Sequence, residues 1–348
     1  NAAHHLAANI DIGGGTSDFV IYKANKPALS TSCKFAANSL FGGTYERNGF
    51  VQRFYPKFKE NISKIEADYK AKGKNSKSAQ IQMLGQILEQ IAETKDSKDL
   101  INFLFTIEDD ELVTKEKIKL SFHDYLANDP DLKIVFIVFY SSLIYHLARL
   151  LKAKNLEVPK TISFSGTGSK ILRITDITAN HNGLKSIAKH LFGEVFGDPQ
   201  DVEIILSKRP KQITCEGGLR SSLTPDQLDT ERAVLILNRP YKPGELNFEE
   251  ISIDTKVELM VNDTAEFIDI LFKPGAIDFD DQFGIARSQI NQFSSDLKSD
   301  LISHLKDSFA RQQDEIDNGG TAEISNSPFF TPLIGALRSL SYKLTSEN

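Results

Sequence analysis

The sequence predicts an α/β fold in which strands and helices alternate around glycine-rich turns. Apolar stretches at 8–12 and 17–23 flank a run of three glycines, which predicts two strands joined by a tight turn. A long apolar segment at 131–154 predicts a buried helix, and 161–172 predicts a strand, a glycine loop and the start of a helix. Strands separated by helical segments favour a sheet with helices packed on it.

The first turn carries three glycines between two carboxylates. Its eight residues are Asp11-Ile12-Gly13-Gly14-Gly15-Thr16-Ser17-Asp18. Glycine is unfavourable inside a strand, but in a turn it can adopt positive φ and let the backbone approach a ligand. Consecutive N–H groups form a cradle for an anion, Asp11 can hold a hydrated divalent cation, and Thr16 adds a hydroxyl group. The turn therefore predicts a site for the phosphates of a metal-bound nucleotide, and a flexible hairpin tip is the alternative.

Two other phosphate motifs are excluded at this turn. A Rossmann loop must open a helix, but residues 18–22 alternate and continue as a strand. A Walker A loop needs Gly-Lys-Ser/Thr at its end, and none follows.

The pattern Asp-x-Gly-Gly-Gly-Thr-x-Asp resembles the second phosphate loop of the actin-like ATPase superfamily, which includes DnaK-type chaperones, FtsA, ParM, MreB and the sugar kinases. Every fixed position of the pattern is met by residues 11–18. The resemblance implies an actin-like (ribonuclease H-like) ATPase lobe with a mixed five-stranded sheet flanked by helices. It also implies ATP and Mg²⁺ as cofactors, with Asp11 holding the metal through water.

Two further glycine turns extend the resemblance. After a strand expected at 30–36, Gly42 and Gly43 stand where chaperone and FtsA-like proteins have a Leu-Gly-Gly turn, with Thr44 expected to cap the next helix. The loop after 161–165 resembles the adenosine motif, and its expected nucleotide contacts are Gly166, Thr167, Gly168, Ser169 and Lys170. Thr167 departs from the family, which mostly has glycine there, and its branched side chain could crowd a nucleotide. Ordinary loop-to-helix and strand-to-helix connections are the alternatives.

The same resemblance divides the chain into three parts. Residues 1–56 and 132–222 are expected to form the core of the second lobe, residues 57–131 an inserted, mainly helical subdomain, and residues 223–348 an α+β C-terminal extension. In relatives a Glu and a Lys of the inserted subdomain contact the adenosine. The candidates are Glu89, Glu93 and Lys95, for which a solvated helix face is the alternative.

The C-terminal extension matches no family motif. Strands are expected at 232–238, 251–261 and 267–272, of which the second alternates apolar and polar residues. A long amphipathic helix is expected at 283–315 and a last helix at 332–344.

Composition limits the class of protein. The chain has 348 residues, is 40% hydrophobic and 25% charged, and carries a net charge of −6, which argues against nucleic acid as a partner. Its two cysteines, Cys33 and Cys215, fit a reducing compartment and a cytoplasmic location. Residues 134–151 are shorter than a membrane span and contain His146 and Arg149, so a buried helix is expected and no membrane span.

These observations predict the nucleotide-binding second lobe of a bacterial actin-like or chaperone-like ATPase, as a fragment whose first lobe lies outside this chain. Its partners would be a nucleotide, that first lobe and possible further copies or other proteins. No catalytic residue is assigned, because a second Asp-x-Gly-Thr/Ser loop and a catalytic acid are not identifiable. A non-catalytic scaffold or assembly protein of the cell-division or cytoskeletal kind is the alternative, and a sugar-kinase-like enzyme is third.

Overall fold

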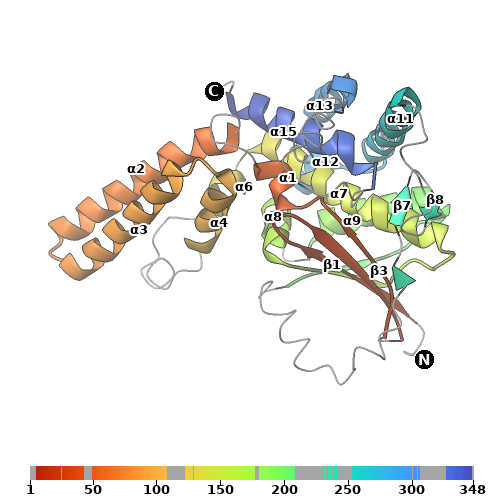
Figure 1. Ribbon diagram of the computed structural model, residues 1–348, viewed down its shortest axis with the longest axis horizontal. Coiled ribbons are helices and arrows are strands. Elements are labelled where there is room, and N and C mark those ends of the chain that lie inside the picture. The colour runs from red at the N-terminus through yellow and green to blue at the C-terminus, as the bar shows by residue number, and fades with distance from the viewer. Residues whose placement is uncertain are drawn as a thin grey trace. The chain divides into compact units, whose positions relative to one another are not determined.

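The described part of the chain forms two compact units (Figure 1). Unit 1 comprises Asn1–Ala37 and Lys133–Leu337, and unit 2 comprises Asn38–Leu132 and Arg338–Asn348. The computed structural model describes residues 5–24, 26–42, 49–107, 122–127, 129–176, 180–207, 231–232, 234–236, 239–241, 253–299, 301–303, 305 and 327–346.

Unit 1 is built on a mixed six-stranded sheet in the order β5-β4-β1-β2-β3-β6. β2 pairs antiparallel with β1, and β3 pairs antiparallel with β2. β4 and β5 run parallel to β1, and the two-residue strand β6 runs parallel to β3. The first five strands confirm the predicted α/β architecture with a mixed five-stranded sheet. The strands are β1 (Leu6–Ile12), β2 (Ser17–Lys23), β3 (Lys26–Cys33), β4 (Thr161–Ser165), β5 (Glu203–Leu206) and β6 (Glu231–Arg232).

Helix α7 (Pro130–Ala153) packs on the apolar face of this sheet (Figure 1). Its Tyr140 ring lies 5.6 Å from Phe164 of β4, and its His146 ring lies 5.5 Å from Phe19 of β2. The predicted buried helix is confirmed, since 94% of its most apolar 18-residue window is buried. Two further helices connect the parallel strands, α8 (Lys170–Thr175) and α9 (Asn182–Phe196).

The C-terminal part of the chain is more helical than predicted. The strands expected at 251–261 and 267–272 are wrong, because residues 253–261 and 267–271 lie in helix α11 (Ile253–Leu271), while 251 and 252 lie outside the described residues. The helix expected from 283 begins later: α12 (Phe279–Phe283) ends at Gly284, whose φ is +67°, and α13 (Arg287–Ser299) follows. The last helix is confirmed as α15 (Phe330–Ser346).

Two further predicted strands, at 232–238 and 30–36, differ from the structure in their bounds. In the range 232–238 the structure describes the end of β6 and then β7 (Val234–Ile236), which pairs with β8 (Arg239–Tyr241). The strand expected at 30–36 is β3, which starts earlier and ends at Cys33.

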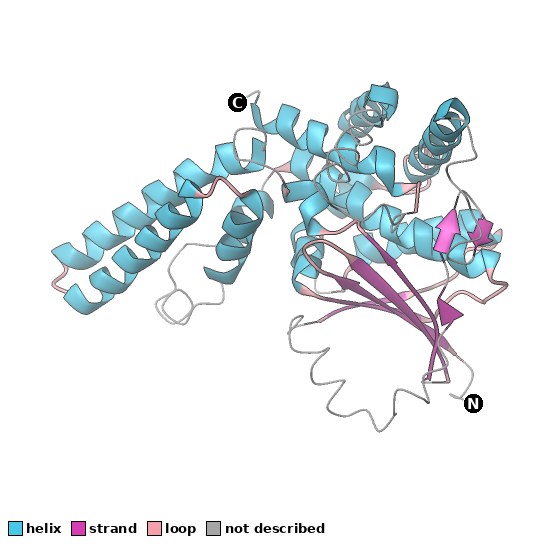
Figure 2. Cartoon of the chain, viewed as in Figure 1, coloured by secondary structure: helices cyan, strands magenta, loops and turns pink. Residues whose placement is uncertain are grey.

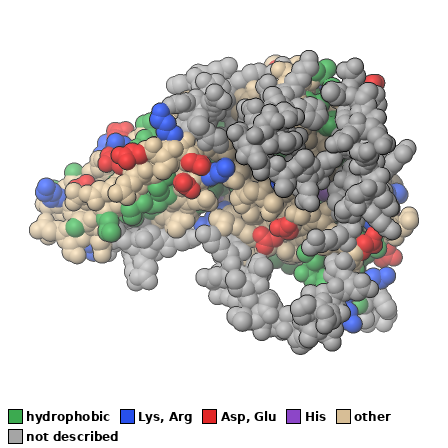
Figure 3. All heavy atoms as spheres, in the orientation of Figure 1, with side chains coloured by type: hydrophobic (Ala, Val, Ile, Leu, Met, Phe, Trp, Pro, Cys, Tyr) green, Lys and Arg blue, Asp and Glu red, His purple; other side chains and the backbone are tan. Residues whose placement is uncertain are grey.

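Every element in the described part of unit 2 is a helix (Figure 2). Helices α2 and α3 form an antiparallel hairpin whose turn contains Gly73 at φ +70°. Both acidic and basic side chains lie on the surface of this hairpin (Figure 3). Phe122 makes edge-to-face contacts with Phe54 and Phe105 in the core of the unit. The helices are α1 (Ala37–Phe41), α2 (Gly49–Ala71), α3 (Asn75–Glu93), α4 (Ser97–Ile107) and α6 (Phe122–Ala127).

Candidate functional site

The glycine turn joins the two central antiparallel strands, β1 and β2. A hydrogen bond from Gly13 N to Thr16 O (2.9 Å) closes it. The strand register places Asp11 directly opposite Asp18, so both carboxylates lie on the same, partly exposed face of the sheet. Beneath the turn, the buried Ser17 Oγ donates to Phe35 O (2.6 Å) and fixes the start of β2.

The turn glycines do not adopt the left-handed backbone that glycine permits. None of Gly13, Gly14 and Gly15 has positive φ, so the expectation of left-handed backbone is wrong for the turn. A Cβ on Gly13 would lie 3.1 Å from Thr16 O, whereas a Cβ on Gly15 would meet nothing within 4 Å. Neither backbone conformation nor packing therefore requires glycine at position 15, which leaves close approach by a ligand as a reason for it.

The loop after β4 packs directly against this turn. Gly166 has φ +78°, and a Cβ there would lie 2.4 Å from Asp11 Oδ1 and 2.3 Å from Ile12 O. A Cβ on Gly168 would lie 2.8 Å from Gly13 O. The structure thus brings Asp11, Gly13, Gly166 and Gly168 together, but the two loop glycines are already required by the fold.

The remaining residues of the loop shape its path into α8. Thr167, Gly168 and Ser169 form one turn of 3₁₀ helix, and Ser169 Oγ donates to Gly166 O (2.7 Å). The side chains of Thr167 and Lys170 are partly exposed, whereas Ser169 is buried. Ser169 therefore stabilises the loop from within.

Sequence reasoning missed the residue that holds Asp11. Ser165, the last residue of β4, lies opposite Asp11 in the parallel register and donates its hydroxyl to Asp11 Oδ2 (2.9 Å). Ser165 in turn accepts from Asn9 Nδ2 (3.2 Å). The available signal was the alternation of serines along β4, but its meaning depends on a register between segments 154 residues apart.

The donor set fits a cation that is shared with a ligand. Like charges directly opposite each other on a strand pair are destabilising, and a cation between Asp11 and Asp18 would relieve that repulsion. Thr16 Oγ1 lies 3.5 Å from Asp18 Oδ2 and adds a third oxygen to the turn. Among the described residues no group of three or more His, Cys, Asp or Glu side chains could hold a metal. Two carboxylates suit Mg²⁺, which keeps several waters and takes further oxygens from phosphate.

Two other groups of predicted site residues lie in unit 2. Gly42 closes α1, donating its N–H to Asn38 O (2.7 Å), and a Cβ there would lie 2.4 Å from that oxygen. Gly43 and the capping residue Thr44 lie outside the described residues. Glu89 forms an ion pair with Lys59 (2.9 Å), and about half of each side chain is exposed. This environment agrees with the alternative that Glu89 lies on a solvated helix face.

The neighbouring candidates behave in the same way as Glu89. Glu93 and Lys95 are exposed where α3 ends, and Lys95 has φ +54°. Nothing in unit 2 distinguishes these two side chains from other solvated charges.

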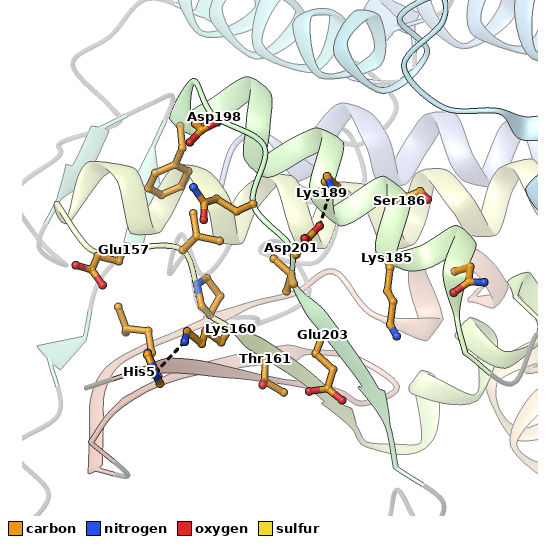
Figure 4. A pocket seen from close by; sticks show the side chains of 17 residues that line it. His5, Glu157, Lys160, Thr161, Lys185, Ser186, Lys189, Asp198, Asp201 and Glu203 are labelled. Carbon is orange, nitrogen blue, oxygen red and sulfur yellow. Dashed lines mark hydrogen bonds and ion pairs between the residues drawn. The ribbon is translucent and has the colours of Figure 1, made fainter. Parts of the chain in front are cut away.

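A groove of about 1100 Å³ lies at the opposite end of the sheet (Figure 4). It is lined by the amino ends of β1, β4 and β5 and by one side of α9. One pair of opposite charges in the groove is neutralised, since Lys189 pairs with Asp201 (2.7 Å). Lys160 Nζ lies 2.9 Å from His5 Nε2. Groups of both signs line it without converging on one point, so the turn at Asp11 is the better candidate site.

Comparison with known proteins identifies no relative. No protein-family model, no curated protein and no solved structure matches this chain.

Proposed function

We propose that this chain is the nucleotide-binding second lobe of an actin-like or chaperone-like ATPase, and that the turn from Asp11 to Asp18 binds the phosphates of Mg·ATP. The observation that carries the proposal is the convergence of two glycine loops on one carboxylate. Asp11 lies between the β1–β2 turn and the loop at Gly166, and both loops expose backbone at the same edge of the sheet. The mixed five-stranded sheet flanked by helices is what the resemblance to an actin-like lobe requires.

The position of this edge supports the proposal independently. From β1 the chain builds β2 and β3 on one side, and it then crosses over to build β4 and β5 on the other side. β1 and β4 are adjacent and parallel, so the strand order reverses between them and their carboxyl ends meet. Ligands of open α/β sheets bind outside the carboxyl ends of the strands at such a reversal. The groove in Figure 4 lies at the amino ends instead.

Each part of the site has one role in the proposal. Asp11, with Asp18 across the ladder, attracts Mg²⁺, which would neutralise phosphate charge when bound. The N–H groups of Gly14, Gly15 and Thr16 would face the terminal phosphates, since the N–H of Gly13 already donates to Thr16 O. The loop of Gly166–Lys170 flanks the adenosine, and the branched side chain of Thr167 reduces the space for the nucleotide. Hydrolysis would require a first lobe, whose phosphate loop is not identifiable in the sequence, so we expect this chain to bind ATP weakly and not to turn it over.

Calorimetric titration of the 348-residue chain with Mg·ATP tests the proposal. We expect weak binding to the wild type and at least a tenfold loss in Asp11→Asn, which keeps the size of the side chain and removes the charge. Asp198→Asn, an exposed carboxylate lining the groove at the far end of the sheet, is the matched control and should bind as the wild type does.

Two results would contradict the proposal. Equal binding by wild type and Asp11→Asn would place the nucleotide elsewhere. No binding by the wild type would leave the non-catalytic scaffold as the better interpretation, which Thr167 in the adenosine loop also favours.

A further inference from the structure

The helical hairpin of unit 2 contains a proline inside one of its helices. Pro56 lies within α2, between Gly49 and Ala71. Proline has no N–H group to donate to the carbonyl oxygen of Gln52, and its ring crowds that carbonyl group. Bends in long helices concentrate at such prolines. The turn from Gln52 to Pro56 is therefore the part of α2 that resists bending least.

The second helix of the hairpin ends at the same level. An ion pair between Lys59 of α2 and Glu89 of α3 (2.9 Å) fixes how the two antiparallel helices lie beside each other. Counting three residues from this pair toward α4 reaches Pro56 on one helix and Ala92 on the other (Figure 1). α3 ends at the next residue, Glu93. The interruptions of the two helices therefore lie side by side.

The interruption after α3 is built into the backbone. Lys95 has φ +54°, in the left-handed region, which costs free energy for a residue other than glycine. On one side, Thr94 Oγ1 donates to Ile91 O (2.7 Å) and closes α3. On the other side, the N–H of Lys98 donates to Asp96 Oδ1 (2.8 Å) as α4 begins. α3 and α4 are therefore separate helices joined at Lys95.

The part of the hairpin beyond these interruptions is held together internally. Ser78 Oγ of α3 donates to Glu66 O of α2 (3.3 Å). A Cβ on Gly85 of α3 would lie 3.2 Å from Ile62 Cγ2 of α2, so the two helices are in close contact midway along the segment. Together with the ion pair nearer the base, these contacts make the segment a single rigid body.

The base of the hairpin belongs to a different cluster of side chains. Phe54, which precedes the proline, is 3% exposed and its ring lies 5.9 Å from that of Phe122 in α6. Arg53 forms an ion pair with Asp129 (2.9 Å), and less than a quarter of either side chain is exposed. The first turns of α2 are therefore fixed to the core of unit 2 and not to α3.

We propose that Pro56 and Lys95 are the two points of a hinge, about which the outer hairpin, residues 57–93, rotates against the base of unit 2. A hinge consists of a few residues, often at the ends of helices, that absorb changes in φ and ψ while the bodies on either side stay rigid. One interruption alone would be restrained by an intact helix beside it. Here α2 carries a proline and α3 ends at the same level, so neither helix stiffens the other. The proposal is independent of the nucleotide site.

A small rotation at the hinge is enough to displace the tip of the hairpin. The arm from Pro56 to Ala71 is about 22 Å long at about 1.5 Å per residue, so a rotation of about 20° moves the tip by about 8 Å. A displacement of this size is measurable as a spread of distances between two spin labels.

Pulsed electron paramagnetic resonance between nitroxide labels tests the hinge in the 348-residue chain. One label is placed at the tip, on Ala71→Cys, and the other on α4, on Asn102→Cys, and both positions are exposed. The background is Cys215→Ser, and Cys33 resists labelling because burial raises its thiol pKa to about 12. A reference pair, Ala71→Cys with Gln90→Cys, lies within the outer hairpin and measures the spread that the labels themselves cause.

The wild type should give a distribution about twice as wide for the tip-to-α4 pair as for the reference pair. Pro56→Ala restores the hydrogen bond to Gln52 and should narrow the tip-to-α4 distribution by about half. Lys95→Gly permits more backbone conformations and should widen it. Ser63→Ala, a change to the same residue at an exposed position of the outer hairpin, is the control and should leave it unchanged.

Two results would overturn the hinge. Equal widths for the two label pairs in the wild type would show that the hairpin is rigid on its base. A tip-to-α4 distribution that either Pro56→Ala or Lys95→Gly leaves unchanged would also overturn it, because the proposal requires both points. Loss of fold is not expected in Pro56→Ala, since alanine favours a helix interior far more than proline does, and far-UV circular dichroism checks this for each variant.

Discussion

Lowering the pH should destabilise unit 1 through a single buried side chain, His146 of α7. Its ring lies 5.5 Å from Phe19 of the sheet and 4.9 Å from Phe330 of α15, and only 2% of the residue is exposed. Within the described part of the chain its Nδ1 is buried without a hydrogen-bond partner. Burial lowers the pKa of His146 from 6.5 to about 3, and the positive charge of Arg149 adds to this effect.

The sign and size of the effect follow from proton linkage. Below about pH 6.5 the unfolded chain binds a proton at this position that the folded chain does not bind, so unfolding becomes more favourable as the pH falls toward 3. The loss in free energy of unfolding is about 2 kcal/mol between pH 7.5 and 5.0, and it reaches about 4 kcal/mol at pH 3. Above pH 7 the contribution is fully present and should not change.

Urea unfolding at pH 7.5 and 5.0 measures this term when wild type and His146→Leu are compared. The chain has no tryptophan, so near-UV circular dichroism of the buried Tyr140 and Tyr145 reports on the core around α7. The wild type should lose about 2 kcal/mol more than His146→Leu over this interval, because the leucine variant retains every other titrating group. Equal losses in the two proteins would refute the buried neutral state of His146.

Three further predictions concern other parts of unit 1. Asp263→Ala should cost about 3–5 kcal/mol in urea unfolding, because it leaves Arg149 buried without its ion-pair partner at 2.5 Å, and replacing both residues by leucine should recover most of the loss. In a Cys215→Ser background Cys33 should resist a thiol reagent at pH 8 until the protein unfolds, since burial raises its thiol pKa to about 12. Asp18→Asn should stabilise the chain by about 0.2–1 kcal/mol in EDTA while weakening Mg·ATP binding in titrations, because it removes the repulsion with the opposite carboxylate.

The parts of the fold that sequence could predict are those with one dominant signal. The glycine run predicts where β1 ends and where β2 begins. The long apolar segment predicts a helix that is either buried in the core or spans a membrane, and it forms the buried α7. The range 251–272 carries two signals at once: Ile253, Thr255, Val257 and Leu259 alternate as in a strand. The residues that the structure buries recur instead at helical spacing, as Met260, Thr264, Phe267, Ile268 and Leu271. The segment folds as a helix because the apolar positions at helical spacing extend over more residues than the alternating ones. The helix leaves Leu259, one of the alternating residues, 42% exposed.

The candidate site shows a different limit of sequence reasoning. Asp11 and the turn glycines are contiguous, so their chemistry can be read from one segment. The role of Ser165 depends on β4 lying beside β1 in a particular parallel register, which no local pattern determines. Gly166 is similar: the sequence assigned it to a nucleotide, and the structure shows that the carboxylate of Asp11 already occupies the space of a Cβ.

What distinguishes this edge of the sheet is that local rules of stability are broken there together. Two carboxylates face each other across a strand pair, and a glycine stands at position 15 without need of its conformation or its small size. Beside them, Asn9 and Ser165 extend the polar contacts of Asp11 along β1 and β4. Natural sequences are locally consistent, and departures from that consistency concentrate at functional sites. The Mg·ATP proposed above would account for the facing carboxylates and for Gly15, whereas a hairpin tip that serves only to connect two strands accounts for neither.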